Sequence, residues 1–99
     1  MKCYNLLKIT KSTRHDKKMM AVFSHCETER TKTVHFGANG MSDYTIHKDS
    51  DRKKRYIDRH RSRENWDDYT TPGSLSRWIL WNKNTLRASI QDYKRRFRL

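Results

Sequence analysis

The sequence predicts a small α+β domain in which a three-stranded antiparallel sheet is covered by two to three helices. The first observation is a change of residue period. Residues 1–47 hold short β-branched and aromatic runs separated by polar turns, whereas residues 48–99 hold apolar residues at helical spacing. The second is length, since 99 residues make one core that buries roughly two thirds of the unfolded surface. We therefore expect a single domain over residues 1–99, mainly β in 1–47 and mainly α in 48–99.

Three segments of the first half have the composition of strands. Cys3–Thr10 mixes Leu, Ile and Tyr with polar residues, and Met19–Ser24 is the most apolar run of this half. The polar stretch Lys11–Lys18 lies between them, and the third strand, Lys32–Phe36, follows the polar residues 26–31. An antiparallel meander of these three strands is the simplest arrangement, and it buries one face of the sheet.

The stretch Thr33–Asp49 marks the change from strands to helices. Gly37 and the pair Asn39-Gly40 supply residues that adopt positive φ at low cost, which indicates a reversal of the chain. Asp49 and Ser50 then stand where a helix N-cap is expected, immediately before a charged run.

The first predicted helix, Asp51–Arg63, is strongly basic. Its apolar ridge is thin and consists of Tyr56, Ile57 and His60. A connector, Asn65–Gly73, follows and ends in Pro-Gly, which breaks a continuing helix.

Two further helices are predicted after the connector. Ser74 is expected to cap a short one, with Leu75, Trp78 and Ile79 on one face, and residues 82–84 interrupt it. The last helix begins at Thr85. Its apolar stripe is the cleanest in the chain, and we expect this face to be core; it comprises Leu86, Ile90, Tyr93 and Phe97.

Composition limits the class of protein. Hydrophobic residues are 33% of the chain and charged residues 34%, against about 45–50% and 25% in typical domains, so aromatic side chains must supply much of the core. Cys3 and Cys26 are too few and too far apart for a disulfide framework or a paired-cysteine zinc site, which favours a reducing compartment. We expect neither a signal peptide nor a membrane span, because no apolar run is long enough.

The net charge of +12 predicts a negatively charged partner. Eight basic and four acidic side chains precede Lys48, while fifteen basic and seven acidic ones lie from Lys48 onward, so most of the excess belongs to the predicted helices. The positive charge of the run from Arg52 to Arg63 is offset only in part by three acidic residues in and beside it, Asp51, Asp58 and Glu64. This basic surface and its neighbouring aromatics form the predicted partner-binding site: Arg52, Lys53, Lys54, Arg55, Arg59, Arg63, Trp66, Tyr69, Trp81, Lys94, Arg95 and Arg96.

Four motifs in order along the chain resemble a family of small proteins from nucleocytoplasmic large DNA viruses, which carries a domain of unknown function. They are TVHFG (33–37), SDYTIHKD (42–49), RKKRYIDRHRSRENW (52–66) and SRWILWNK (76–83), and the resemblance extends over residues 8–97. It implies a viral origin and a single compact domain. It carries over no catalytic or binding residues.

Catalytic and metal sites are weakly supported by the residue pattern. Cys3, Cys26, His25 and His35 have the right chemistry for zinc, but nothing in their spacing demands a metal, and His25 and Cys26 point to opposite faces of a strand. His15-Asp16, Asp43 and His47 with Asp49 suit acid-base chemistry, yet phosphate loops, nucleophile elbows and paired carboxylates are lacking. We expect no enzyme, no cofactor and no small-molecule substrate.

The viral resemblance and the basic surface together lead to a functional hypothesis. We expect a non-enzymatic structural protein of the virion, assembled in the host cytoplasm or nucleus. It would be a minor capsid component that bridges acidic surfaces of other capsid proteins or an anionic membrane. The alternative is a protein of the viral core that binds and condenses DNA, with nucleic-acid phosphates as the partner. The sequence leaves open whether the basic face meets protein, lipid or DNA, and how many copies assemble.

Overall fold

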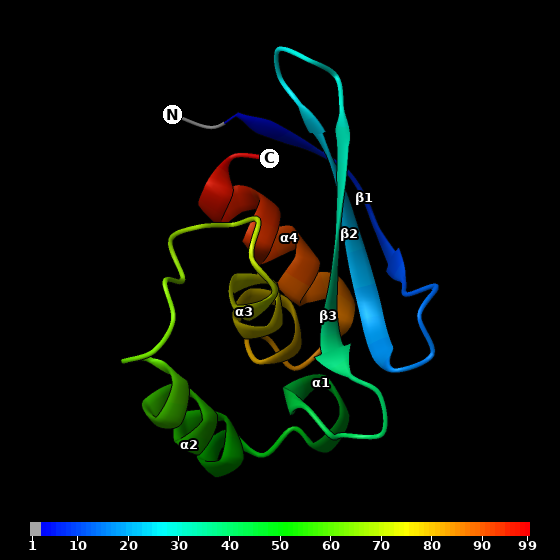
Figure 1. The fold of residues 1–99 in the computed structure, drawn as a ribbon. Helices are drawn as coiled ribbons and strands as arrows, with labels where there is room; N and C mark the ends of the chain where they lie inside the picture. The colour runs from blue at the N-terminus through cyan, green and yellow to red at the C-terminus, as the bar shows by residue number, and fades with distance from the viewer. Residues whose placement is uncertain (1–2) are drawn as a thin grey trace.

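The computed structural model describes residues 3–99 as a sheet with helices packed against one of its sides (Figure 1). The three strands are antiparallel in the order β1-β2-β3, which confirms the predicted small α+β domain. In Figure 1, α3 and α4 lie against the sheet, whereas α2 lies at the periphery of the molecule. The elements are β1 (Tyr4–Lys11), β2 (Lys17–His25), β3 (Thr31–Ala38), α1 (Tyr44–His47), α2 (Ser50–His60), α3 (Pro72–Leu75), the π-helix η1 (Ser76–Leu80) and α4 (Leu86–Phe97).

β2 and β3 are longer than predicted because the hairpin ends also pair, whereas β1 has the predicted length and is shifted by one residue. Tyr4 pairs with His25 at the start of β1, and a shift of register between Leu6 and Lys8 leaves Leu7 57% exposed. One step beyond Tyr4, the N–H of Cys26 donates to the carbonyl of Cys3 at 2.7 Å. Although the two cysteines are far apart along the sequence, the register of β1 and β2 places them opposite each other.

One face of the sheet builds the core. Ala21 and Phe23 of β2 alternate inward with Val34 and Phe36 of β3, as the period of two predicts. Helical residues cover this face, so the sheet and the helices share one hydrophobic core; the buried ones are Leu75, Ile79, Leu80 and Tyr93.

The start of the second helical region differs from the prediction. The N-cap is Thr71, whose side chain accepts from the N–H of Ser74, and Pro72 occupies the first turn, where its missing N–H costs nothing. Ser74 is fully buried instead, with its hydroxyl donating to the carbonyl of Asn65 at 3.0 Å. The Pro-Gly pair thus begins a helix that continues into η1.

The last helix begins as predicted, with Thr85 as its N-cap. Tyr93 is fully buried, and Ile90 and Phe97 are partly buried against the core. Leu86, however, is 36% exposed, which corrects its assignment to the core. It is the first residue of α4, and only the later turns of the helix contact the core cluster.

The reversal after β3 contains a short helix that the sequence did not predict. Asp43 caps α1 by accepting from the N–H of Thr45, and its other oxygen pairs with Lys18 of β2. Gly37 and Gly40 have positive φ as expected, whereas Asn39 does not. At Gly37 a Cβ would lie 2.6 Å from the Cδ1 atom of Leu80, so glycine also permits the close approach of β3 to η1.

Candidate functional site

The helix α2 is attached to the rest of the protein by aromatic stacking. Tyr56, its only buried residue, lies parallel to Trp81 with ring centroids 4.3 Å apart, and His60 stacks on Tyr56 at 4.3 Å. Burial raises the pKa of Tyr56 to about 12, so the phenol stays neutral. Asp49 caps the helix, as predicted, by accepting from the N–H groups of Asp51 and Arg52.

This attachment turns most of the cations of α2 toward solvent. Lys53 is different, since its ammonium lies 4.8 Å from the centroid of the Tyr44 ring and its side chain is partly buried. Burial, together with the nearby charges of Arg77 and Lys83, lowers the pKa of Lys53. The exposed cations on α2 and in the turn after it, which we call the α2 basic face, are Arg52, Lys54, Arg55, Arg59, Arg61 and Arg63.

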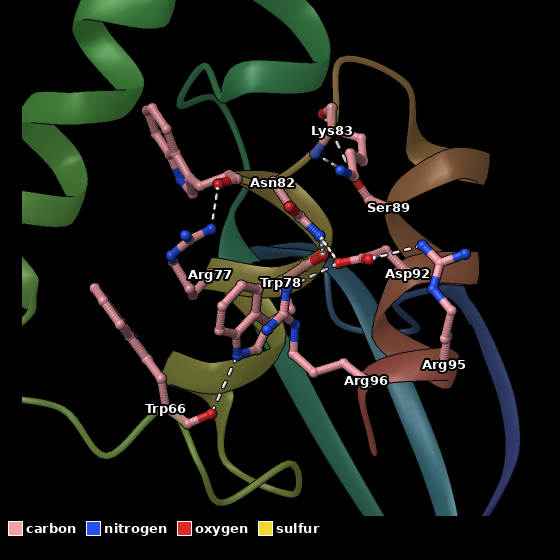
Figure 2. Close-up of polar contacts among 10 residues, drawn as sticks. Trp66, Arg77, Trp78, Asn82, Lys83, Ser89, Asp92, Arg95 and Arg96 are labelled. Carbon is pink, nitrogen blue, oxygen red and sulfur yellow. Dashed lines mark hydrogen bonds and ion pairs between the residues drawn. The ribbon is translucent and has the colours of Figure 1, made fainter. Parts of the chain in front are cut away.

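Beside α2, tryptophans and arginines alternate in a stack that we call the Arg–Trp ladder, composed of Trp66, Arg77, Trp78 and Arg96 (Figure 2). The guanidinium of Arg77 lies 5.4 Å from the centroid of the Trp66 ring and 4.2 Å from that of Trp78. The guanidinium of Arg96 lies 3.7 Å from the centroid of the Trp78 ring. The Trp78 indole N–H donates to the carbonyl of Trp66 at 3.1 Å, so the connector and η1 are fixed to each other.

Arg77 is the least compensated charge of the ladder. One terminal nitrogen donates to the carbonyl of Trp81 at 2.8 Å, while its buried Nε has no hydrogen-bond partner among residues 3–99. Burial is the largest cause that lowers the pKa of Arg77, and the charges of Arg96 and Arg61 lower it further. The charge of Asp92 offsets this in part, but no carboxylate among residues 3–99 forms an ion pair or a hydrogen bond with the guanidinium.

The nearest carboxylates are already engaged. Asp92 accepts from Asn82 at 2.7 Å and pairs with Arg95 at 2.9 Å and with Arg96 at 3.4 Å. Although burial opposes ionisation of Asp92, these hydrogen bonds and charges hold its pKa at about 2. The positive charge of Arg77 is therefore only partly compensated, and an anion that reached it would be stabilised.

Glu64 is engaged in the same way. It accepts from the indole N–H of Trp66 at 2.9 Å and lies 3.7 Å from the ring nitrogen of His60. This carboxylate holds the first tryptophan of the ladder in place and contributes no hydrogen bond to Arg77 among the described residues.

Several of the predicted site residues do come together. Apart from Lys53, the cations of α2 are exposed, and Arg52, Arg55 and Arg59 follow one side of the helix at spacings of three and four residues. Trp66 and Arg96 both belong to the ladder. Lys94 and Arg95 are exposed on α4, where Arg95 pairs with Asp92.

Two predicted contact aromatics lie inside the fold instead. Tyr69 is 8% exposed, and its hydroxyl donates to the carbonyl of Tyr4 at 2.6 Å, so its assignment to an exposed surface is wrong. Trp81 is partly buried, and the stack on Tyr56 covers one of its faces. The burial of these two rings has the same cause, since a small core is completed by aromatic side chains from the connecting segments.

Arg77 and Trp78 are site residues that could not be predicted from the sequence. The sequence places Trp78 with Leu75 and Ile79 on one face of a short helix, and it gives Arg77 no distinguishing pattern. The ladder joins residues 66, 77–78 and 96, so the contacts depend on the packing of η1 against α4. No spacing rule brings such distant positions together.

We expect Tyr69→Phe to destabilise the fold by about 1–3 kcal/mol, because it leaves a partly buried backbone carbonyl, that of Tyr4, without its partner. The hydroxyl also accepts from the N–H of Tyr4 at 3.2 Å, so two backbone groups lose a contact. Urea unfolding measures the loss. Tyr44→Phe is the matched control, since Tyr44 is only partly buried; equal effects of the two changes would contradict the role given to Tyr69.

Within residues 3–99, no group of three or more His, Cys, Asp and Glu side chains is arranged to hold a metal ion. None of the described helices has the length and apolar character needed to cross a bilayer.

Comparison with known proteins identifies one family. A family described as "Family of unknown function (DUF5754)" matches residues 7–60, which run from β1 to the end of α2. No curated protein and no solved structure matches the chain. The matched region contains the α2 basic face as far as Arg59, whereas Arg77, Trp78 and Arg96 follow it. Because the match covers more than half of the sequence, the chain belongs to this family of unknown function, DUF5754.

Proposed function

We propose that this protein is a non-enzymatic, virion-associated protein that binds nucleic acid through the Arg–Trp ladder and the α2 basic face. The observation that carries the proposal is Arg77, a half-buried guanidinium clamped between two indole rings with no carboxylate partner in the described chain. A planar guanidinium of this kind is suited to a phosphate, which accepts its N–H groups in a fixed geometry.

The surroundings of Arg77 favour a polyanion over a single small anion. Lys53, Arg61 and Arg96 are close enough to influence its charge or to be influenced by it. The α2 basic face continues this positive region with cations that are exposed along the whole helix. A phosphate chain offers charges at regular intervals, so one strand could contact both regions.

The aromatic rings support the same partner. Proteins that bind single strands combine a positive groove with aromatic rings on which bases stack. Trp66 is partly exposed and stands at the end of the ladder nearest to α2. It is the ring we expect to contact a base, since Trp78 carries a guanidinium on each side.

The viral setting of the proposal rests on the motif resemblance. A protein with this surface that is packaged with a genome would neutralise phosphate charge in the viral core. The large positive charge then has a partner in the particle, which offsets the self-repulsion of a small basic fold.

Arg77→Gln tests the ladder directly. We expect the affinity for a labelled single-stranded oligonucleotide to fall about 10-fold to 100-fold, the usual value of a charge-assisted hydrogen bond of about 1.5–3 kcal/mol. Fluorescence anisotropy at fixed salt measures the change. Arg87→Gln removes the same charge from an exposed position of α4, outside the ladder, and should change the affinity much less.

Two results would count against the proposal. If Arg77→Gln and Arg87→Gln weaken binding equally, the ladder has no special role. The second result is that the unmodified protein binds polyglutamate as tightly as the oligonucleotide at the same salt concentration. In that case it selects its partner by charge alone and does not prefer phosphate over carboxylate.

A minor capsid component that bridges other coat proteins or a membrane is the second candidate. It is favoured by Met41 and Ile46, which are 66% and 61% exposed and lie beside the same hollow next to Lys18. Apolar side chains of this size in a basic protein suit a contact with another protein. Quantifying the protein in DNA-filled and DNA-free particles separates the candidates. A constant ratio to the major coat protein indicates the capsid, and a ratio that falls with the DNA indicates the genome.

A further inference from the structure

Cys3 and Cys26 lie opposite each other at one end of the hairpin formed by β1 and β2. The register that pairs Tyr4 with His25 continues outward by one step, and the N–H of Cys26 donates to the carbonyl of Cys3 at 2.7 Å. Residues paired in this way in an antiparallel sheet have Cα atoms about 5.5 Å apart. That separation falls within the range of about 4.4–6.8 Å that disulfides span.

The thiols meet the other requirements for a disulfide. Both cysteines are exposed, so an oxidant can reach them. Local desolvation is the largest cause that raises the pKa of Cys26, and the neighbouring Cys3 thiol raises it further, as expected for two side chains that lie close together. Cys3 also lies just before the first residue of β1, at the end of the sheet.

We propose that Cys3 and Cys26 form a reversible intramolecular disulfide. This modification site is separate from the Arg–Trp ladder and does not depend on the proposed function. It closes the loop of residues 3–26 and ties the start of β1 to the end of β2.

The reaction is thiol–disulfide exchange with a small-molecule disulfide such as oxidised glutathione. One thiolate attacks a glutathione sulfur, forms a mixed disulfide and releases one glutathione thiolate. The second thiolate then attacks the mixed disulfide at the protein sulfur and releases the other glutathione. The two cysteines lose two electrons and two protons, and one glutathione disulfide becomes two glutathione thiols.

The disulfide would restrain one wall of a cavity as well as the start of β1. Cys3 and Tyr4 border a cavity of about 650 Å³, together with Tyr69, Arg96 and Phe97. Oxidation would therefore fix one wall of a cavity that Arg96, a member of the ladder, also lines.

The experiment is equilibration of the folded full chain with mixtures of reduced and oxidised glutathione, followed by acid quenching, alkylation and mass spectrometry. We expect a monomer that has lost two hydrogen atoms, with Cys3 and Cys26 in one cross-linked peptide. The same titration in urea should need an oxidising ratio at least about tenfold higher, because only the folded sheet holds the thiols together.

Cys26→Ser is the control, and it should give only a mixed disulfide between Cys3 and glutathione. The oxidised protein should also melt roughly 10 °C higher than the reduced protein, since the closed loop restricts the unfolded chain. If the folded chain accumulates only glutathione adducts or intermolecular dimers, the proposal is wrong. It is equally wrong if folded and unfolded chains oxidise at the same glutathione ratio.

Discussion

Reversing three charges on the α2 basic face, Arg52→Glu, Lys54→Glu and Arg55→Glu together, is expected to weaken oligonucleotide binding at least about a hundredfold. All three side chains are exposed, so the change alters the surface without disturbing the core. Lys53 is left unchanged because it packs over the Tyr44 ring and its loss would also affect folding.

The salt dependence of binding is a second, independent measure of the effect of this triple substitution. Each phosphate contact contributes about 0.7–0.9 to the slope of log affinity against log salt concentration, so losing three contacts should make the slope shallower by about two to three. Anisotropy titrations over a range of salt concentrations measure both quantities. Circular dichroism should show that α2 still forms.

A matched control has the same total charge but a different location. Lys8→Glu, Lys11→Glu and Arg30→Glu change three exposed residues of the sheet and its hairpin turn. If binding depends only on net charge, both triple variants will lose the same affinity, and the site on α2 is refuted. If the helix forms the site, the sheet variant will keep most of its affinity.

Asp43→Ala is expected to destabilise the fold by about 3–5 kcal/mol, the usual cost of leaving a buried charge without its partner. The side chains of Asp43 and Lys18 are only 3% and 15% exposed, so the ammonium would remain in a mostly dry environment. The variant also removes the N-cap of α1, which accepts from the N–H of Thr45. Such a loss is a large part of the stability of a domain of this size.

Urea unfolding monitored by circular dichroism measures this effect. Asp43→Asn separates the two contributions, because the amide oxygen still accepts the N–H of Thr45 while the charge is gone. Asp16→Ala is the control, since it breaks the exposed ion pair with Arg14, whose side chains are 54% and 49% exposed, and should change stability little. Similar losses from Asp43→Ala and Asp16→Ala would show that the buried pair contributes nothing special.

The strands and the last helix could be predicted because local patterns determine them. Alternation along the strands places Phe23, Val34 and Phe36 on one face of the sheet. Capping preference predicts Thr85 as the N-cap of α4, and the helical period predicts that Tyr93 is buried. The helix α1 could not be predicted in this way, since its four residues are too few to show a period.

Features that depend on packing were harder to predict. In η1 the N–H of Trp81 bonds to the carbonyl of Ser76, five residues earlier, and this widening of the helix has no signature in composition. Tyr69 lies in a polar connector of the sequence. In the fold its ring packs in the core, and its hydroxyl donates to the carbonyl of Tyr4. The basic face of α2 was predicted because charge density is local, whereas the ladder required the contact between η1 and α4.

The attachment of α2 through one buried tyrosine also has a consequence for motion. Regions with few buried apolar contacts open at a lower free energy than the central strands of a sheet. Among its described residues α2 buries only Tyr56, while β2 pairs with a strand on each side. Amide hydrogens of α2 should therefore exchange with solvent through local opening, well before those of β2 do. A partner that contacts both α2 and the ladder would suppress this local opening. Slower amide exchange confined to α2 would therefore show that the partner is bound.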